Sequence, residues 1–554
     1  MNGRPYQLEA VDHVFKSFTE GKKTALIVAP TGTGKTVTFA LIIQRFASVY
    51  PSHLRVLVIA HREELIHQAA QKIERVIGER PDVEMASLRA DLHMFHRAKV
   101  VVASKDTLQG KRLERFDPKT FGLIITDECH HAPATSYQSI YKHFADALHV
   151  GVTATPDRHD EVALGKVFHD AEPYVYELPD AIKDGYLVPI KQHSVVVEGL
   201  DYSGVRTTAG DLNGRDLADV MNNEEVLQQI AAATVADSGS RRTIVFAPPG
   251  FKKDGEDCFR VSERLTEILN RHRPDSAQLV MGTTPSEERK ATLIDFSAGR
   301  FQFLVNVGVF TEGFDEPGIE LVVMARATKS RALYAQMIGR GTRPLPGLID
   351  GLDTAEQRRA AIAASAKPEL VVLDFEGNAG SHKLIHTADV LGGNYDDEVV
   401  DLANKMARKS GKPTDMANAL ELAAEQIRRR KEYDRLRRIH LVAKAEYSKR
   451  EINPFDLVGI EPPRSRGWDH EQPPSDKQMA TLAKFGIPTN GIHTKKQAGA
   501  ILSKCIDDVK AGRASYKQRA LLAKFGYVGN YSFAQASGLI EQCIAAKKKK
   551  WMTA

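Results

Sequence analysis

Short apolar runs alternate with helical patterns over residues 1–160 of the 554-residue chain. Strands of a parallel sheet that is covered by helices on both faces read as continuous apolar runs, without the alternation of half-buried strands. Five runs have this character: 24–30, 55–60, 99–104, 121–127 and 149–154. The pattern therefore predicts an α/β lobe over residues 1–160.

A second set of apolar runs follows a less regular stretch, residues 161–225, which we expect to connect two lobes. The members of this set are 242–247, 277–281, 303–307, 319–325 and 369–375. They predict a second parallel sheet between helices over residues 226–395. The expected fold class is α/β, with two tandem lobes and an α-helical carboxyl-terminal region.

The last third of the chain has a different character. Residues 396–460 show helical periodicity and carry a basic cluster at 428–438, which fits a DNA-contacting helix and a solvated helix face equally well. Residues 461–474 are rich in proline and charge and are predicted to be a linker. The chain ends in a basic tail, residues 547–554.

An internal repeat occupies residues 475–546. DKQMATLAKFG at 476–486 matches YKQRALLAKFG at 516–526, which predicts two tandem helical hairpins. Each helix is expected to begin at a capping box, in which a hydroxyl satisfies an early amide and a glutamine reaches back. The pairs are Ser475 with Gln478, Thr494 with Gln497, Ser515 with Gln518, and Ser532 with Gln535. Phe485 and Phe525 lie in apolar stripes, which favours core positions over base-stacking platforms.

Composition narrows the class of protein. Apolar residues make up 42% and charged residues 27%, and no apolar run approaches the ~20 residues that a membrane span needs. The first residues lack the apolar core of a signal peptide, so we expect a cytoplasmic protein of a bacterial or phage-infected cell. The net charge of +5 is mild, but basic residues crowd the last third, which is compatible with a nucleic-acid partner. The cysteines, Cys129, Cys258, Cys505 and Cys543, lie far apart, so neither a disulfide framework nor a zinc site is indicated.

Candidate chemistry begins at residues 29–36, Ala-Pro-Thr-Gly-Thr-Gly-Lys-Thr, between an apolar strand and a helix predicted over 37–49. Glycines let the backbone curl so that its amides face phosphate oxygens, although alanine stands where the general phosphate-loop pattern has its first glycine. The residues expected to cradle phosphate are Thr31, Gly32, Thr33, Gly34, Lys35 and Thr36. Lys35 can reach the terminal phosphates, and Thr36 can bind Mg²⁺.

Asp127-Glu128-Cys129-His130 ends the apolar run 121–127. A carboxylate at the end of a strand can hold Mg²⁺ beside the phosphate loop, and the next carboxylate can orient and deprotonate the attacking water. The pattern thus assigns Asp127 to the metal and Glu128 to the water. Cys129 and the histidines after it do not have the spacing of a zinc site.

Residues 1–390 resemble superfamily 2 helicases, whose two RecA-like P-loop lobes share one ATP. Besides the two motifs above, the resemblance rests on RPYQ at 4–7, AHREEL at 60–65, ASKDTL at 103–108, GVTATP at 151–156, TEGFD at 311–315 and QMIGRGTR at 336–343. It implies that ATP is contacted by Arg4, Gln7, Gly313, Asp315, Gln336, Arg340 and Arg343. It implies nucleic-acid contacts for Arg62, Ser104 and Thr311. It implies that hydrolysis is coupled to lobe movement through His130, Thr153 and Thr155.

DECHH, the run 328–344 and LVVLDFEGNAGSHKL at 370–384 are most similar to the type III restriction-subunit-like branch, which includes bacterial and phage DNA helicases. Asp374 and Glu376 in that run could form a nuclease carboxylate pair, but a further strand of the second lobe is the favoured interpretation. The DECH form also occurs in some RNA helicases, so RNA stays open beside DNA.

The expected function is an ATP-dependent, Mg²⁺-requiring helicase or translocase that acts on nucleic acid, with DNA favoured. The residues expected to act in catalysis are Lys35, Glu128, Gln336, Arg340 and Arg343. Three alternatives stay open: a duplex DNA translocase that does not separate strands, an RNA helicase, and a binding scaffold whose motor is only a switch. A protein partner of the carboxyl-terminal repeats is also left open.

Overall fold

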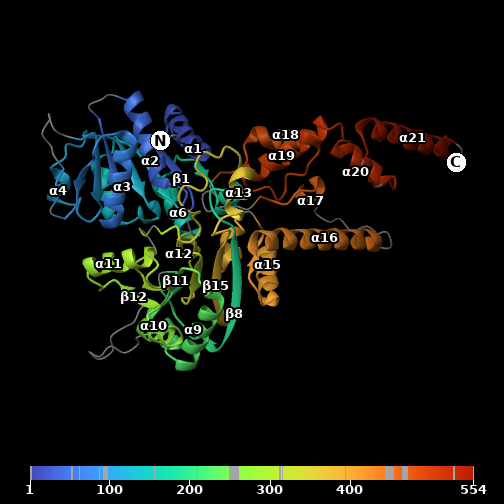
Figure 1. Ribbon diagram of the computed structural model, residues 1–554. Helices are drawn as coiled ribbons and strands as arrows, with labels where there is room; N and C mark the ends of the chain where they lie inside the picture. Colours follow the sequence, from blue (N-terminus) through green and yellow to red (C-terminus); the bar gives the residue numbers. More distant parts are fainter. Residues whose placement is uncertain are drawn as a thin grey trace. The chain divides into compact units, whose positions relative to one another are not determined.

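The computed structural model describes residues 3–50, 54–60, 63–86, 88–90, 98–154, 158–208, 210–248, 261–310, 314, 316–393, 395–442, 454–463, 472–527, 529 and 531–552. The chain divides into two compact units, Met1–Lys431 and Glu432–Ala554. The first unit holds two seven-stranded sheets with helices packed against them (Figure 1). No helix among the described residues combines the length and the apolar character that crossing a membrane requires.

The first sheet has the strand order β3-β4-β2-β5-β6-β1-β7, and all its strand pairs are parallel. The strands are β1 (Thr24–Val28), β2 (Arg55–Ala60), β3 (Asp82–Glu84), β4 (Val100–Ser104), β5 (Phe121–Asp127), β6 (Leu148–Thr153) and β7 (Pro173–Val175). The helices are α1 (Pro5–Thr19), α2 (Lys35–Val49), α3 (Glu63–Ile77), α4 (Lys111–Glu114), the 3-10 turn η1 (Cys129–His131), α5 (Thr135–His143) and α6 (Arg158–Val167). The five predicted strands are confirmed, and β1, β2 and β4 are buried at every position, as helices on both faces require.

The second sheet has the order β12-β13-β11-β14-β15-β8-β16. Its strands are β8 (Ile190–Asp201), β11 (Thr243–Phe246), β12 (Ala277–Met281), β13 (Phe303–Val307), β14 (Leu321–Met324), β15 (Leu370–Asn378) and β16 (Thr414–Asp415), while β9 (Thr207–Thr208) and β10 (Asp211–Leu212) form a separate ribbon. The helices are α7 (Leu178–Lys183), α8 (Gly214–Met221), α9 (Glu224–Ser238), α10 (Val261–His272), α11 (Ser286–Ser297), α12 (Arg331–Ile338), α13 (Ala355–Ala363), α14 (Thr387–Leu391), α15 (Asp397–Ser410) and α16 (Met416–Val442). The five predicted strands of this lobe are also present.

One expectation needs correction: residues 161–225 are more than a connection, because β8 lies within them and belongs to the second sheet. β8 pairs in parallel with β15 over most of its length, and β16 pairs antiparallel on its other side. Its residues alternate between buried and exposed positions instead of forming a continuous apolar run. A search for continuous apolar runs therefore misses this strand.

The second unit contains α17 (Pro454–Val458), α18 (Asp476–Phe485), α19 (Lys495–Lys510), α20 (Tyr516–Lys524) and α21 (Phe533–Met552). Helices α18 and α19 pack on each other, as do α20 and α21. All four predicted capping boxes are formed. Phe485 packs against an apolar core with Leu482 and Ile501, as its place in the stripe predicts. Helix α21 continues through the predicted basic tail as far as Met552.

Candidate active site

The phosphate loop lies between β1 and α2, at the carboxyl end of the first sheet. Gly32 and Gly34 have φ angles of +93° and +80°, a backbone region that favours glycine. A Cβ on Gly34 would lie 3.0 Å from the Gln7 amide nitrogen, and one on Gly32 would lie 3.2 Å from Cγ of Arg343. Both glycines are therefore required by conformation and by the close approach of other segments, as a loop that cradles phosphate requires.

Side chains of the RPYQ motif, at the start of helix α1, hold this loop through hydrogen bonds to its backbone. Nε2 of Gln7 donates to the carbonyl oxygens of Thr33 and Gly34 at 3.1 and 3.4 Å, and the hydroxyl of Tyr6 also donates to the Thr33 carbonyl. Oε1 of Gln7 accepts from the backbone N–H of Arg4 at 2.9 Å. The structure thus shows Gln7 supporting the loop backbone, while the adenine contact implied for Arg4 and Gln7 stays a prediction. The sequence did not predict this supporting role for Tyr6.

Lys35 and Glu128 form an ion pair beside the loop. Nζ of Lys35 lies 2.8 Å from Oε1 of Glu128, and both side chains are almost buried. Glu128 has a φ angle of +45°, which is uncommon for a residue with a Cβ, and its N–H donates to Oδ1 of Asp127 at 3.0 Å. Such strained residues concentrate at functional sites. Because both side chains are almost buried, either charge alone would be poorly solvated, and the ion pair compensates for the lost solvation.

The donors near the loop fit Mg²⁺ held together with phosphate. Mg²⁺ keeps several waters and is usually bound through one or two carboxylates plus substrate phosphates. Asp127 supplies a carboxylate at the end of β5, and Thr36 supplies a hydroxyl in the first turn of α2. Among the described residues, no group of three His, Cys, Asp or Glu side chains could hold a metal ion by itself.

Cys129 and His130 join the DECH motif to β6. Cys129 is fully buried, and burial raises the pKa of its thiol well above the usual value. A Cβ on Gly151 of β6 would lie 2.9 Å from the Cys129 sulfur, so the two small residues let these segments meet. Nδ1 of His130 lies 3.0 Å from the hydroxyl of Thr153 and 3.5 Å from Oε2 of Glu128. Two of the three residues implied to couple hydrolysis to movement are therefore in direct contact.

The segment after α12 brings the second lobe onto the phosphate loop. A Cβ on Gly339 would lie 2.7 Å from Cβ of Thr31, and the Arg343 side chain lies against Gly32. Burial, together with the charge of Arg4, lowers the pKa of Arg343 to about 10. Arg340 is also buried, but one of its guanidinium nitrogens donates to the Phe314 carbonyl oxygen at 2.8 Å. Gln336 is buried on α12.

Two lysines near this contact were missed in the sequence. Burial lowers the pKa of Lys72 on α3, as does the charge of Arg343, while Asp127 raises it. Nζ of Lys367 donates to the carbonyl oxygens of Pro317 and Arg343 at 2.6 and 2.7 Å. Neither lysine lies in a motif, so each is identified only by its surroundings in the fold: nearby charges for Lys72 and backbone carbonyl oxygens for Lys367.

Other expected site residues are placed less fully. Ser104 ends β4, and its carbonyl oxygen accepts from the N–H of Leu108 at 2.9 Å. The expected residues outside the described part of the chain are Arg62, Thr155, Thr311, Gly313 and Asp315. Their roles stay predictions.

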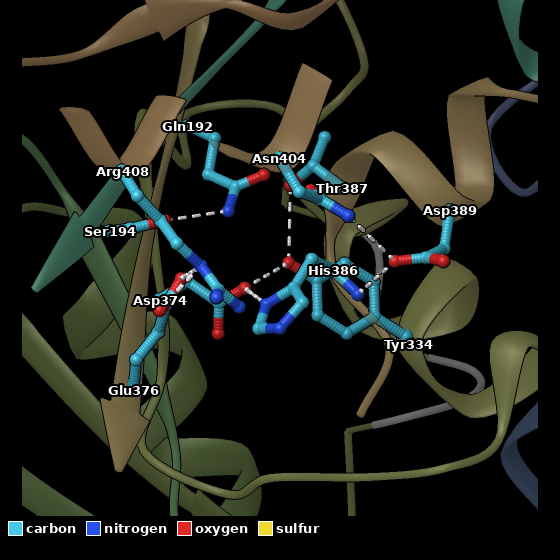
Figure 2. Close-up of polar contacts among 10 residues, drawn as sticks. All are labelled: Gln192, Ser194, Tyr334, Asp374, Glu376, His386, Thr387, Asp389, Asn404 and Arg408. Atoms are coloured by element: carbon cyan, nitrogen blue, oxygen red, sulfur yellow. Dashed lines mark hydrogen bonds and ion pairs between the residues drawn. The ribbon is translucent and has the colours of Figure 1, made fainter. Parts of the chain in front are cut away.

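Asp374 and Glu376 have the surroundings of structural carboxylates. Oδ2 of Asp374 accepts from the Tyr334 hydroxyl at 3.0 Å and lies 2.8 Å from Nδ1 of His386 (Figure 2). Oε2 of Glu376 lies 2.7 Å from Nε of Arg408. Both carboxylates are on β15, which agrees with the interpretation of this run as a strand of the second lobe and not as a nuclease site.

Two segments of the chain match families of known proteins. Residues 1–158 match the type III restriction enzyme, res subunit family, and residues 225–344 match the helicase conserved C-terminal domain. The helicase-family protein IRC3 of Saccharomyces cerevisiae is 32% identical over 354 residues, which are 61% of this chain and 49% of that protein. The type I restriction enzyme EcoAI endonuclease subunit of Escherichia coli is 29% identical over 363 residues, 61% of this chain and 44% of that subunit.

The chain spans about half the length of these two relatives. Among solved structures, a fragment of an HsdR-type subunit of a type I restriction enzyme from Vibrio vulnificus aligns over 68% of this chain and 64% of its own, with 22% identity and a TM-score of 0.48. Both family matches fall on the two lobes, in the order that the motifs predict. The two lobes are therefore similar in sequence to superfamily 2 helicases, in the branch related to type III restriction subunits.

Proposed function

We propose that the protein hydrolyses ATP in order to move along nucleic acid, and that its track is DNA. The observation that carries this proposal is the contact between lobes, where Gly339 and Arg343 of the second lobe pack on Thr31 and Gly32 of the phosphate loop. A nucleotide in the loop would be enclosed by both lobes. Its binding and loss would therefore be tied to their relative motion.

ATP with Mg²⁺ would supply the phosphoryl group and the charge that activates it. Lys35 would exchange its ion pair with Glu128 for the terminal phosphates, and Thr36 and Asp127 would hold the metal. Glu128 would then accept a proton from the attacking water. Arg343 would stabilise negative charge in the transition state, in the manner of an arginine finger.

His130 is proposed to report the state of Glu128 to β6. Its Nδ1 lies near both the Thr153 hydroxyl and Oε2 of Glu128, so a change at the carboxylate would compete with the hydrogen bond to Thr153. Arg340, which donates to the Phe314 carbonyl, is proposed to tie the segment after β13 to the segment after α12. Each nucleotide state would thus alter the end of a strand in each lobe.

The choice of DNA is supported by the names of relatives. One is a type I restriction endonuclease subunit, and another, from Sulfurisphaera tokodaii, is named a DNA 3'-5' translocase and is 23% identical over 377 residues. The second name makes translocation without strand separation the strongest alternative to unwinding. A strand-displacement assay run beside a triplex-displacement assay separates the two, because a pure translocase removes only the third strand.

The test of the motor is ATP turnover measured with single-stranded DNA, duplex DNA, forked DNA and RNA. Stimulation by DNA is expected, and it should be lost in Lys35→Ala and in Glu128→Gln. Lys16→Ala, on the exposed face of α1, removes the same charge away from the site and should keep near-normal turnover. Near-normal stimulated turnover in either site variant would refute the assignment, and stimulation by RNA alone would refute the DNA track.

Salt dependence tests how the track is held. Backbone contacts on a single strand should give a slope of about −0.7 per neutralised phosphate in a plot of log affinity against log salt. A flat titration would exclude a groove that follows phosphates.

A cytoplasmic location stays a prediction, since a relative from Schizosaccharomyces pombe is named as mitochondrial. A protein partner of the carboxyl-terminal repeats also stays a prediction.

A further inference from the structure

The carboxyl-terminal repeats carry an excess of positive charge. Residues 475–546 contain ten Lys and Arg side chains against four Asp and Glu, so this short segment alone exceeds the net charge of +5 of the whole chain. One of the four carboxylates, Asp508, is buried and lies 3.0 to 3.1 Å from nitrogens of three cations. A surface with so large an excess of one sign attracts a polyanion.

Lysines lie in the first turns of three helices of the repeats. They are Lys477 of α18, Lys495 of α19 and Lys517 of α20, and all three side chains are exposed. Within the described part of the chain, none of the three forms an ion pair. Because the helix dipole favours acidic residues at a helix start and disfavours cations there, these lysines do not serve the stability of their helices.

Hydrogen bonds bring the starts of neighbouring helices together in each repeat. Nε2 of Gln478, in the first turn of α18, donates to the carbonyl oxygen of Lys495, the first residue of α19, at 3.2 Å. The backbones of Lys477 and Lys495 are therefore close to each other. In the second repeat, Nε2 of Gln518 donates in the same way to the carbonyl oxygen of Phe533, the first residue of α21, at 3.3 Å.

Phe533 presents an exposed aromatic ring on a fixed backbone. The residue is 57% exposed, and its N–H donates to the Gly512 carbonyl oxygen at 2.8 Å. Two cationic residues lie beside it in the fold: Lys517 directly precedes Gln518, and Arg513 forms a β-bridge with the residue before Phe533. Proteins that bind single strands combine such features, because bases stack on the ring while cations hold the phosphates.

Helix α18 connects the lysines of the first repeat to those of the second. Lys477 lies at its start, and Gly486 is the C-cap residue at its end. A Cβ on Gly486 would lie 2.8 Å from Cγ of Lys517, so the stem of that lysine lies against the end of α18. The helix has ten residues and is about 15 Å long. The two ends of this surface are therefore far enough apart to follow a strand over several nucleotides.

The kind of charge favours nucleic acid over a protein partner. Lysine is depleted in interfaces between proteins, whereas contacts from Lys and Arg to phosphates dominate the affinity for nucleic acids. We propose that the repeats bind single-stranded nucleic acid on this surface, outside the two motor lobes. Lys477, Lys495 and Lys517 contact phosphates, and a base stacks on Phe533. The binding needs no ATP, so it goes beyond the proposed motor.

The salt dependence of binding tests the phosphate contacts. Fluorescence anisotropy of the full chain without ATP, with a labelled thymidine oligonucleotide, gives the slope of log affinity against log salt. Lys477→Ala, Lys495→Ala and Lys517→Ala combined should make this slope shallower by about 2, because each lost phosphate contact removes about 0.7. Lys409→Ala with Lys412→Ala, two exposed lysines outside the repeats, should leave the slope as in the parent. An unchanged slope in the triple variant would overturn the proposal.

A comparison of single-stranded and duplex DNA tests the stacked base. Phe533→Ala should weaken single-strand binding about tenfold without changing the salt slope, and Phe533→Trp should retain the affinity. Duplex binding should not change, because paired bases are not free to stack on the ring. No loss on single strands, or an equal loss on both substrates, would refute the stacking. These measurements are made without ATP, so their failure does not bear on the motor, which is tested by ATP turnover through Lys35 and Glu128.

Discussion

Lys367 makes the stability of the second lobe depend on pH near neutrality. The residue lies just before β15 and is 1% exposed, and its ammonium group donates to two backbone carbonyl oxygens. Burial lowers its pKa to about 7, although Glu320 and Glu316 act in the opposite direction. In the unfolded chain the same group keeps its proton up to about pH 10.5. Between these values the unfolded chain binds more protons than the folded one.

The sign of the effect follows from this proton difference. The free energy of unfolding rises with pH wherever the unfolded state holds more protons, so the protein gains stability as pH rises above 7. With these two pKa values the gain between pH 7 and pH 9 is about 2 kcal/mol. Below pH 6 both states hold the proton, and Lys367 contributes almost no further change.

Lys367→Met removes this titration, so the variant is expected to lose the corresponding slope. Urea unfolding followed by circular dichroism at pH 6, 7, 8 and 9 gives the free energy for both proteins. The difference between them cancels every other titrating group and should change by about 2 kcal/mol between pH 7 and pH 9. Lys409→Met, at an exposed position of α15, is the matched control and should show a constant difference. Parallel curves for the parent and Lys367→Met would refute the burial argument.

Three further predictions concern other buried positions. Burial lowers the pKa of His149 to about 3, so the parent should lose about 2 kcal/mol between pH 7 and pH 5 as the unfolded histidine takes up a proton. His149→Phe should flatten this loss in urea unfolding. Gly151→Val places atoms within contact of the Cys129 sulfur and should cost about 2 kcal/mol, which a melting curve would register as a lower Tm. Asp508 is 6% exposed and pairs with three cations that are themselves partly exposed, so Asp508→Asn should destabilise α19 by about 1 kcal/mol, measured by amide hydrogen exchange in that helix.

Continuous apolar runs located the central strands of both lobes because such strands are covered on both faces. The strands that escaped the sequence lie where this condition fails. β3 and β7 are three-residue strands at the edges of the first sheet, and β8 alternates between buried and exposed positions. β16 has only two residues. Their positions depend on pairing with distant strands, which the local pattern does not record.

The same distinction separates the site residues that were predicted from those that were not. Lys35 is identified by its own loop, since glycines, strand and helix all lie within a few residues of it. Lys367 bonds to carbonyl oxygens 50 and 24 residues away in the chain, and its own surroundings read as an ordinary solvated turn. The local sequence therefore predicts a functional residue only where the groups that define its role lie in the same loop. The support that the second lobe gives to Arg343 becomes visible only when the fold brings Pro317, Arg343 and Lys367 together.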